Sequence, residues 1–361
     1  MEALSQAEAF ARIRLLRSPN VGPVSYRQLL HRFGTAQAAL TALPDLLARS
    51  GRAYQPASES RVAGEVQAVR NAGARYLFHD SSDYPPLLAE LESAPPILTC
   101  RGDAGLAQRP CVAIVGARNA SAAAVKLART FAGELAEAGF VVVSGLARGI
   151  DGAAHHAALA GGTIGVIASG IDIAYPPEHA DLQAAIASQG MLLAEQPPAT
   201  EPLARHFPAR NRIIAGLAAG TLVVEAAPKS GSLITARLAG EAGREVMAVP
   251  GSPLDSRSHG CNQLIRDGAT LVQRTEDVIE LLTTFQGQPR SILRETAFDW
   301  TMTEDAEDPA SIADLLTTAP VAVDELVRQS GASAGAVQLA LLELELAGGL
   351  VRHAGGRVSR S

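Results

Sequence analysis

Cationic and hydroxyl side chains recur at short turns in the middle of this 361-residue sequence. At the first turn, a β-branched run ends at Gly116 and is followed by Arg118 and Ser121, just before an Ala-rich stretch with helical spacing. A glycine, a cation and a hydroxyl at a strand-to-helix turn make an anion site, because the helix N-terminus adds backbone N–H groups and the positive end of its dipole. These residues predict phosphate binding.

Three further segments repeat this chemistry. The segment SGLARGID places a cation before a helix, HFPARNRIIAG carries two cations around an amide, and APKSGSLITA is a hydroxyl-rich turn. Surface ion pairing is the alternative interpretation for the two cations of HFPARNRIIAG. Because four such loops are expected on one sheet, together they predict a groove for phosphates. The candidates in these segments are Arg148, Arg210, Asn211, Arg212, Lys229, Ser230, Gly231, Ser232 and Thr235.

The same loops argue against a cofactor or a metal. A dinucleotide site would show G-x-G-x-x-G and an acidic residue closing the next strand, whereas the sequence has GARNAS and its second strand ends at Ser144. Asp151 and His155 are four residues apart on one predicted helix, but no third ligand accompanies them, and a helix N-cap is the simpler role for Asp151. No paired carboxylates or nucleophile–base set stands out, so we expect no catalytic residue, metal or cofactor.

The elements that position these loops follow from the apolar pattern. Seven short, nearly continuous apolar runs alternate with Ala-rich helical patterns between residues 112 and 273. Such runs indicate a mainly parallel sheet that is covered on both faces. The central region is therefore predicted to be a doubly wound, Rossmann-like α/β fold, with ligands beyond the carboxyl ends of its strands. The Pro-rich stretch 76–109 predicts a connector or an edge strand.

Smaller modules are expected at both ends. Residues 1–75 predict helices that are interrupted by a turn at 19–23. This turn either presents backbone N–H groups to phosphate, as helix-hairpin-helix modules do, or belongs to a small helical accessory domain. Residues 309–361 predict a winged helix-turn-helix. Its second helix contains Glu343 and Glu345 but no Lys or Arg, which favours a protein contact over reading a duplex. The predicted divisions are 1–75, 76–285, an acidic linker at 286–308, and 309–361.

Overall charge is a poor guide to the partner of this chain. The net charge is −6, yet residues 276–311 carry two basic and nine acidic side chains, while residues 110–275 carry thirteen of each. The negative charge therefore belongs to the linker, and a nucleic-acid partner is compatible with the rest. We expect no membrane span, because no apolar stretch approaches 18 residues. Three cysteines without metal-site spacing and a start without a secretory pattern predict a reduced, cytoplasmic protein.

Taken together, the motifs resemble the DNA processing protein A (DprA/Smf) family. The resemblance rests on VAIVGARNAS, SGLARGIDGAAHHAAL, ASGIDIAYPPEH, FPARNRIIAGL, VVEAAPKSGSLITA, VPGS and GCNQLIRDGA, in the order and spacing of the family. It implies an extended Rossmann core with a SAM-like or helix-hairpin-helix N-terminal domain and a C-terminal winged helix. It also implies a homodimer that binds single-stranded DNA, protects incoming DNA and helps load RecA recombinase during natural transformation, in competence and DNA recombination.

The family's phosphate pocket maps onto Gly116, Arg118, the segment 210–212, the loop 230–232 and Thr235. Two positions differ from the family pattern: Ala117 replaces a serine, and Pro177 stands where some members carry a basic residue. Only 4% of residues are aromatic, so base stacking is expected to be minor unless Tyr175 or Phe207 contributes.

The alternative is a nucleotide hydrolase of the lysine-decarboxylase-like phosphoribohydrolase type. Those proteins carry a PGGxGTxxE loop with a catalytic glutamate. The corresponding stretch is KSGSLITARLAGE, with Ser230 in place of a glycine and Arg237 near the position that needs an acid. The sequence therefore favours binding without catalysis.

Overall fold

The computed structural model of the chain describes residues 4–48, 54–285, 309–353 and 355–361. These residues form two compact units, one made of Met1–Gly64 with Ser291–Ser361 and the other of Glu65–Arg290. The predicted acidic linker at 286–308 lies outside the described residues.

The unit Glu65–Arg290 is built on a nine-stranded sheet with the order β1-β2-β6-β5-β4-β3-β7-β8-β9. The seven strands from β6 to β9 in this order pair in parallel, and β1 and β2 pair antiparallel at one end. The strands are β1 (Arg75–Phe78), β2 (Ile97–Gly102), β3 (Cys111–Gly116), β4 (Val141–Ser144), β5 (Thr163–Gly170), β6 (Met191–Gln196), β7 (Gly220–Val224), β8 (Glu245–Ala248) and β9 (Thr270–Leu271).

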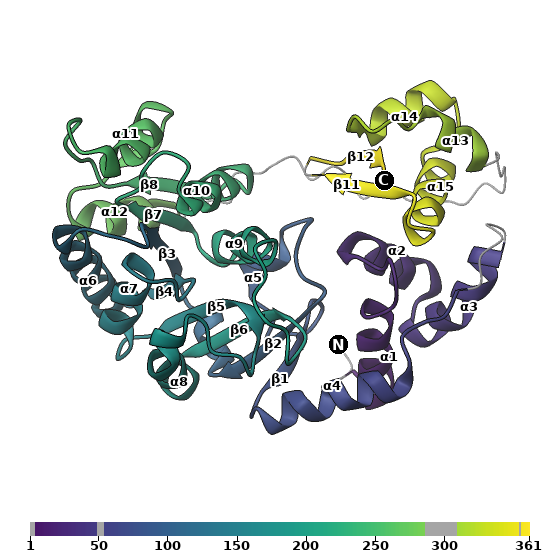
Figure 1. The fold of residues 1–361 in the computed structure, drawn as a ribbon, viewed down its shortest axis with the longest axis horizontal. Helices are drawn as coiled ribbons and strands as arrows, with labels where there is room; N and C mark the ends of the chain where they lie inside the picture. Colours follow the sequence, from purple (N-terminus) through teal and green to yellow (C-terminus); the bar gives the residue numbers. More distant parts are fainter. Residues whose placement is uncertain (1–3, 49–53, 286–308, 354) are drawn as a thin grey trace. The chain divides into compact units, whose positions relative to one another are not determined.

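Helices cover both faces of this sheet (Figure 1). One face carries α6 (Ala122–Glu137), α7 (Ile150–Ala158), α8 (Ala180–Gln189) and α12 (Thr275–Phe285). The other carries α5 (Pro86–Ala89), α9 (His206–Leu217), α10 (Gly231–Glu241) and α11 (His259–Arg266). Short 3₁₀ turns lie at Ala104–Gln108, Pro177–His179 and Ser256–Ser258.

Strand β3 shows why the apolar runs are continuous. Cys111, Ala113 and Val115 pack into the cluster on one face of the sheet, and Val112 and Ile114 pack into the cluster on the other. Because successive side chains point to opposite faces, a strand buried on both sides has no polar alternation. The predicted doubly wound α/β fold is confirmed.

Other expectations about the chain can be checked on the same unit. The stretch 76–109 contains two strands, of which β1 lies at the sheet edge while β2 pairs on both sides. All three cysteines are buried free thiols. Across the described part of the chain, the helices are too short or too polar to cross a membrane.

The other unit combines the two ends of the chain. The N-terminal helices are α1 (Gln6–Leu16), α2 (Pro23–Phe33), α3 (Ala36–Ala48) and α4 (Glu59–Asn71), in the last of which the unit boundary falls. The C-terminal part has α13 (Pro309–Leu315), α14 (Val323–Ser330) and α15 (Ala334–Leu346), with the antiparallel strands β10 (Val321–Ala322), β11 (Leu350–His353) and β12 (Arg357–Arg360). Gly331 ends α14 with φ 68°, as the predicted turn requires. The helical hairpin and the winged helix are therefore both present.

Candidate functional site

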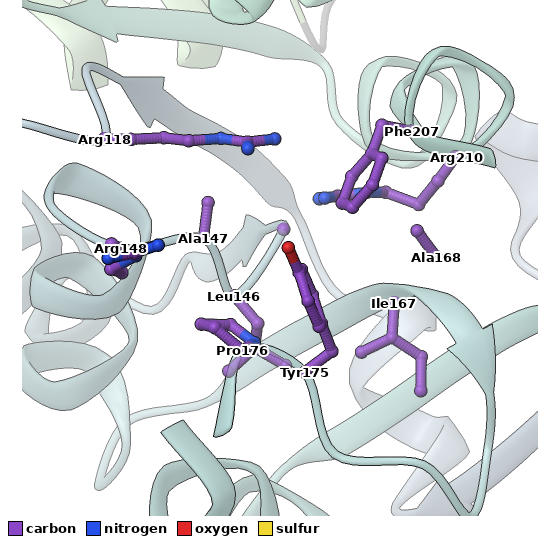
Figure 2. Close-up of a pocket in the computed structure, with 11 residues that line it drawn as sticks. Arg118, Leu146, Ala147, Arg148, Ile167, Ala168, Tyr175, Pro176, Phe207 and Arg210 are labelled. Atoms are coloured by element: carbon purple, nitrogen blue, oxygen red, sulfur yellow. The ribbon is translucent and has the colours of Figure 1, made fainter. Parts of the chain in front are cut away.

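A pocket opens beyond the carboxyl ends of β3, β4 and β5, where the sheet topology predicts a ligand. Figure 2 shows that the Arg118 and Arg210 side chains and the Tyr175 hydroxyl point into one space. The residues that line this pocket are Arg118, Gly145, Leu146, Ala147, Arg148, Ile167, Ala168, Tyr175, Pro176, Phe207 and Arg210.

Two of the cations lie close to the same aromatic ring. The guanidinium carbon of Arg118 lies 5.1 Å from the centre of the Phe207 ring, and that of Arg210 lies 6.0 Å from it. Tyr175 contacts the same ring at 5.8 Å between ring centres, and 39% of its surface is exposed. Phe207 and Arg210 lie three residues apart on α9, so they share a helix face. The pocket therefore pairs phosphate-binding charge with aromatic surface.

Arg210 is buried, with 6% of its surface exposed. Removal from water lowers the pKa of its guanidinium to about 10, while the nearby Asp151 carboxylate raises it and Arg118 lowers it. Burial also raises the pKa of Asp151, against the opposing effect of Arg210. At neutral pH, Arg210 keeps its charge with Asp151 as the nearby acidic group, so the pocket contains a desolvated cation.

The backbone is shaped to hold this arginine. A Cβ added to Gly145 would lie 1.3 Å from Arg210 Nη1, so the guanidinium occupies the space that any larger residue would fill. The carboxylate of Asp151 accepts hydrogen bonds from the backbone N–H groups of Gly145 at 3.1 Å and Ala147 at 3.3 Å. Arg210 Nε is buried without a hydrogen-bond partner within the described residues. Gly145 thus leaves room for the guanidinium, and Asp151 supplies a compensating charge nearby.

The rim of the pocket is more open. Arg148 is exposed and lies 3.4 Å from Glu178 in an ion pair. His179 makes a 2.9 Å hydrogen bond to the carbonyl oxygen of Leu146, a residue held at φ 56°. An exposed ion pair contributes little to stability, so Arg148 can exchange partners at small cost.

Gly116 and Ser121 lie close to the pocket but serve the fold. A Cβ on Gly116 would lie 2.1 Å from the carbonyl oxygen of Val224, so close packing of β3 on β7 requires the glycine. Ser121 caps α6, and its Oγ and backbone N–H donate to the Glu225 carboxylate at 2.6 and 2.9 Å. The protein's own carboxylate therefore occupies the N-terminus of α6, where the sequence predicted an external anion.

The hydroxyl-rich turn begins α10. Ser230 is its N-cap, and the Ser230 and Ser232 hydroxyls are 2.8 Å apart. Lys229 is exposed at φ 68° and Gly231 has no atom near its Cβ position, whereas Thr235 is buried. Asn211 on α9 donates its side-chain N–H to the carbonyl of Gly231 at 3.4 Å. The turn thus adjoins α9, but its residues are not among those that line the pocket.

Arg212 points elsewhere. Its guanidinium bonds the Glu195 carboxylate and the carbonyl of Ser93. Helix α9 begins at His206, ahead of the arginines, although the apolar residues of this segment follow them. Two residues along a helix rotate a side chain by roughly 200°, so Arg210 and Arg212 leave on opposite sides.

The predicted roles of Asp151 and His155 change in the structure. Gly149, not Asp151, is the N-cap of α7, because the Asp151 carboxylate turns back to the amides of the preceding loop. His155 is fully buried and bonded to Thr163 at 2.7 Å. The described residues contain no cluster of three or more His, Cys, Asp or Glu that could hold a metal.

Sequence reasoning missed the residues that support the cations, above all Gly145 and Asp151 in this role. The signal for Gly145 was its place directly after a strand, in SGLARG, where a backbone can approach a side chain closely. Arg237 stands near the position where a phosphoribohydrolase would need its catalytic glutamate. The side chain is exposed and pairs with Glu241 on its own helix.

Comparisons with known proteins find similar sequences. The chain is 34% identical over 381 residues to Protein Smf of Synechocystis, covering 94% of this chain and 96% of that protein. It is 48% identical over 198 residues to DNA processing protein DprA of Streptococcus pneumoniae, covering 54% of this chain and 70% of the relative.

Two solved structures are similar. The X-ray structure of DprA from S. pneumoniae has a TM-score of 0.65 and 35% identity, covering 77% of this chain and 98% of that one. The Helicobacter pylori protein, described for its single-stranded DNA binding mode, has a TM-score of 0.54 and 31% identity, covering 59% and 96%.

Family models match three consecutive regions. A DprA-like N-terminal HHH domain matches residues 6–68, and a DprA winged helix domain matches residues 301–356. The model for DNA recombination-mediator protein A matches residues 75–283, more than half of the chain. The chain therefore belongs to the DNA recombination-mediator protein A (DprA/Smf) family.

Proposed function

We propose that this chain binds single-stranded DNA in the pocket of Arg118, Arg210, Tyr175 and Phe207 and acts as a recombination mediator without catalysis. The observation that carries the proposal is the pair of cations close to the Phe207 ring in one pocket. Cations capture backbone phosphates, and an aromatic face accepts any base, so this combination suits a single strand without sequence preference.

The similarity to the H. pylori protein, whose structure is described for single-stranded DNA binding, supports this assignment. Within the proposal, Arg118 and Arg210 make the central phosphate contacts, while Arg148, Lys229 and the Ser230–Ser232 turn extend the path. Gly116, Ser121, Asn211, Arg212 and Thr235 support the loops instead of touching DNA, since Thr235 is buried and the others make contacts within the protein.

The proposal extends to the function of the family. Acting as a cytoplasmic homodimer, the chain would protect incoming single strands and pass them to RecA recombinase during natural transformation. Membership of the recombination-mediator family supports this role. The apolar residues Ile213, Ile214 and Leu217 are buried in the core of the protomer, so the proposed homodimer would use other residues.

Arg118→Ala tests the DNA site. The side chain is exposed, so its loss should leave the fold intact and weaken binding of a labelled oligothymidylate by about tenfold or more, since a hydrogen bond to a charged group contributes about 1.5–3 kcal/mol. Fluorescence anisotropy at low salt measures the effect. Arg129→Ala, which removes an equally exposed charge from α6, is the control. Equal affinities of the two variants would contradict the assignment.

Recombinase loading is tested separately. The chain should accelerate RecA ATP hydrolysis on single strands already coated with single-strand-binding protein, because strand handover requires access through that coat. Arg118→Ala should lose the acceleration, and Arg129→Ala should keep it. If the chain binds single-stranded DNA but does not accelerate RecA ATP hydrolysis, the mediator role would be contradicted while single-strand binding would stand.

A further inference from the structure

Helix α15 of the winged helix carries two apolar side chains that lie outside the core of its own domain. Leu342 and Leu346 are 3% and 2% exposed. Both belong to the cluster that contains Leu29 of the N-terminal helices. The core of the winged helix is a different cluster, with Leu341 on another face of α15. The face with Leu342 and Leu346 is therefore buried by the N-terminal helices.

Polar contacts fix the same interface. The side-chain N–H of Gln28, on α2, donates to Gln338 Oε1 on α15 at 3.0 Å. The side-chain N–H of Asn20 donates to the carbonyl oxygen of Leu346 at 2.8 Å. Asn20 lies in the hairpin turn between α1 and α2, so the end of α15 is bonded to the hairpin itself.

A carboxylate lies at this hairpin. A Cβ on Gly22, the N-cap of α2, would be 3.7 Å from Glu345 Oε1. Arg352 Nε donates to the other Glu345 oxygen at 2.9 Å, and both side chains are largely buried. The N-terminus of a helix is its positive end. Glu345 thus brings negative charge to the place where a helix hairpin meets a DNA phosphate.

The composition of α15 agrees with this contact. The second helix of a helix-turn-helix enters the major groove of DNA and meets phosphates with positive charge. Helix α15 has no Lys or Arg, and one of its two acidic residues, Glu345, lies close to the hairpin. We propose that α15 is the docking helix for the N-terminal domain of the same chain, and that docking covers the hairpin and keeps duplex DNA from it.

Cross-linking in the full chain tests the contact. Gln28→Cys with Gln338→Cys puts thiols where two side chains meet tip to tip. A direct disulfide needs Cβ atoms about 3.8 Å apart, so a short, reducible bis-thiosulfonate reagent should bridge them. We expect efficient bridging within one chain, seen as a faster band on a non-reducing gel and confirmed by intact mass. The native cysteines are buried, and single-cysteine variants control for them.

Gln28→Cys with Gln329→Cys is the matched control. Gln329 is exposed on α14 and bonds Glu325 of its own helix, so this pair should bridge poorly. Equal bridging of the two pairs would overturn the proposed contact. Bridging mainly between two chains would overturn it too, because the occupant would then be a second copy.

Duplex binding tests the masking. Leu342→Ala/Leu346→Ala should loosen the docked face while leaving the separate winged-helix core in place. We expect affinity for a short labelled duplex to rise in the order bridged protein, reduced protein, leucine variant, with about tenfold or more between the extremes. Single-strand affinity should stay unchanged, because its proposed site lies in the other unit. The same duplex affinity in all three proteins would overturn the masking.

Discussion

Arg210 is the residue on which the pocket depends most. A buried cation is costly in free energy unless nearby groups compensate for lost water. Here Asp151 supplies opposite charge, and Asp151 is itself held by two backbone N–H groups. The guanidinium is thereby placed before any ligand arrives, which reduces the entropy lost on binding.

Gly145→Ala tests this placement. The new methyl group would occupy the position of Arg210 Nη1, so the flexible arginine should move while the fold is kept. We predict single-strand affinity about tenfold lower, measured by fluorescence anisotropy.

Gly133→Ala, within α6, is the matched control, because the nearest atom of another element to its Cβ position is the carbonyl oxygen of Ala157 at 4.0 Å. This change should leave DNA affinity unaltered and stabilise the helix by about 0.5–1 kcal/mol. A Gly145→Ala protein with normal affinity would show that Arg210 does not need its observed position.

At the scale of elements, α7 packs on the sheet through a fully buried histidine. His155 bonds Thr163 on β5 at 2.7 Å. Burial lowers the pKa of His155 from 6.5 to about 3, and the electrostatic effects of His179 and Arg210 act in the same direction. The helix therefore packs only with a neutral imidazole.

This pKa gives a pH dependence with a definite sign. Above pH 6.5 both folded and unfolded states hold neutral His155, and its contribution to stability is complete. As pH falls from 6.5 towards 3, only the unfolded state takes up the proton, so stability is lost. The free energy of unfolding should fall between pH 7 and pH 5 in both proteins. The fall should be about 2 kcal/mol smaller in His155→Gln than in the parent. Urea titrations at the two pH values measure this difference.

His156→Gln is the control for this experiment, since the neighbouring His156 is exposed. It should keep the parent's pH dependence. A His155→Gln protein that loses as much stability as the parent would contradict the buried neutral state.

The elements themselves were largely predictable from the sequence. Continuous apolar runs located the parallel strands, because a strand that is buried on both faces is apolar at successive positions. Parallel strand ends share one edge, which placed Arg118 near Arg210. The start of α9 was not predictable, because apolar spacing in HFPARNRIIAG begins after the arginines, and so the outward turn of Arg212 towards Glu195 was missed.

For the whole molecule, charge distribution matters more than net charge. The sequence is acidic, yet the pocket gathers Arg118, Arg148 and Arg210 at one edge of the sheet. Sequence alone predicted this local excess, since the acidic residues concentrate in 276–311. The sequence did not predict the docking of α15 on the hairpin. The apolar residues of a helix show the same pattern whether they pack on their own domain or on another one.

The salt dependence of single-strand binding tests the central claim most directly. Each phosphate neutralised on a single strand contributes about −0.7 to the slope of log affinity against log salt. The parent should show a steep negative slope, Arg129→Ala the same slope, and Arg118→Ala a slope shallower by about 0.7. A flat dependence in the parent, or equal slopes in all three proteins, would contradict phosphate capture in this pocket.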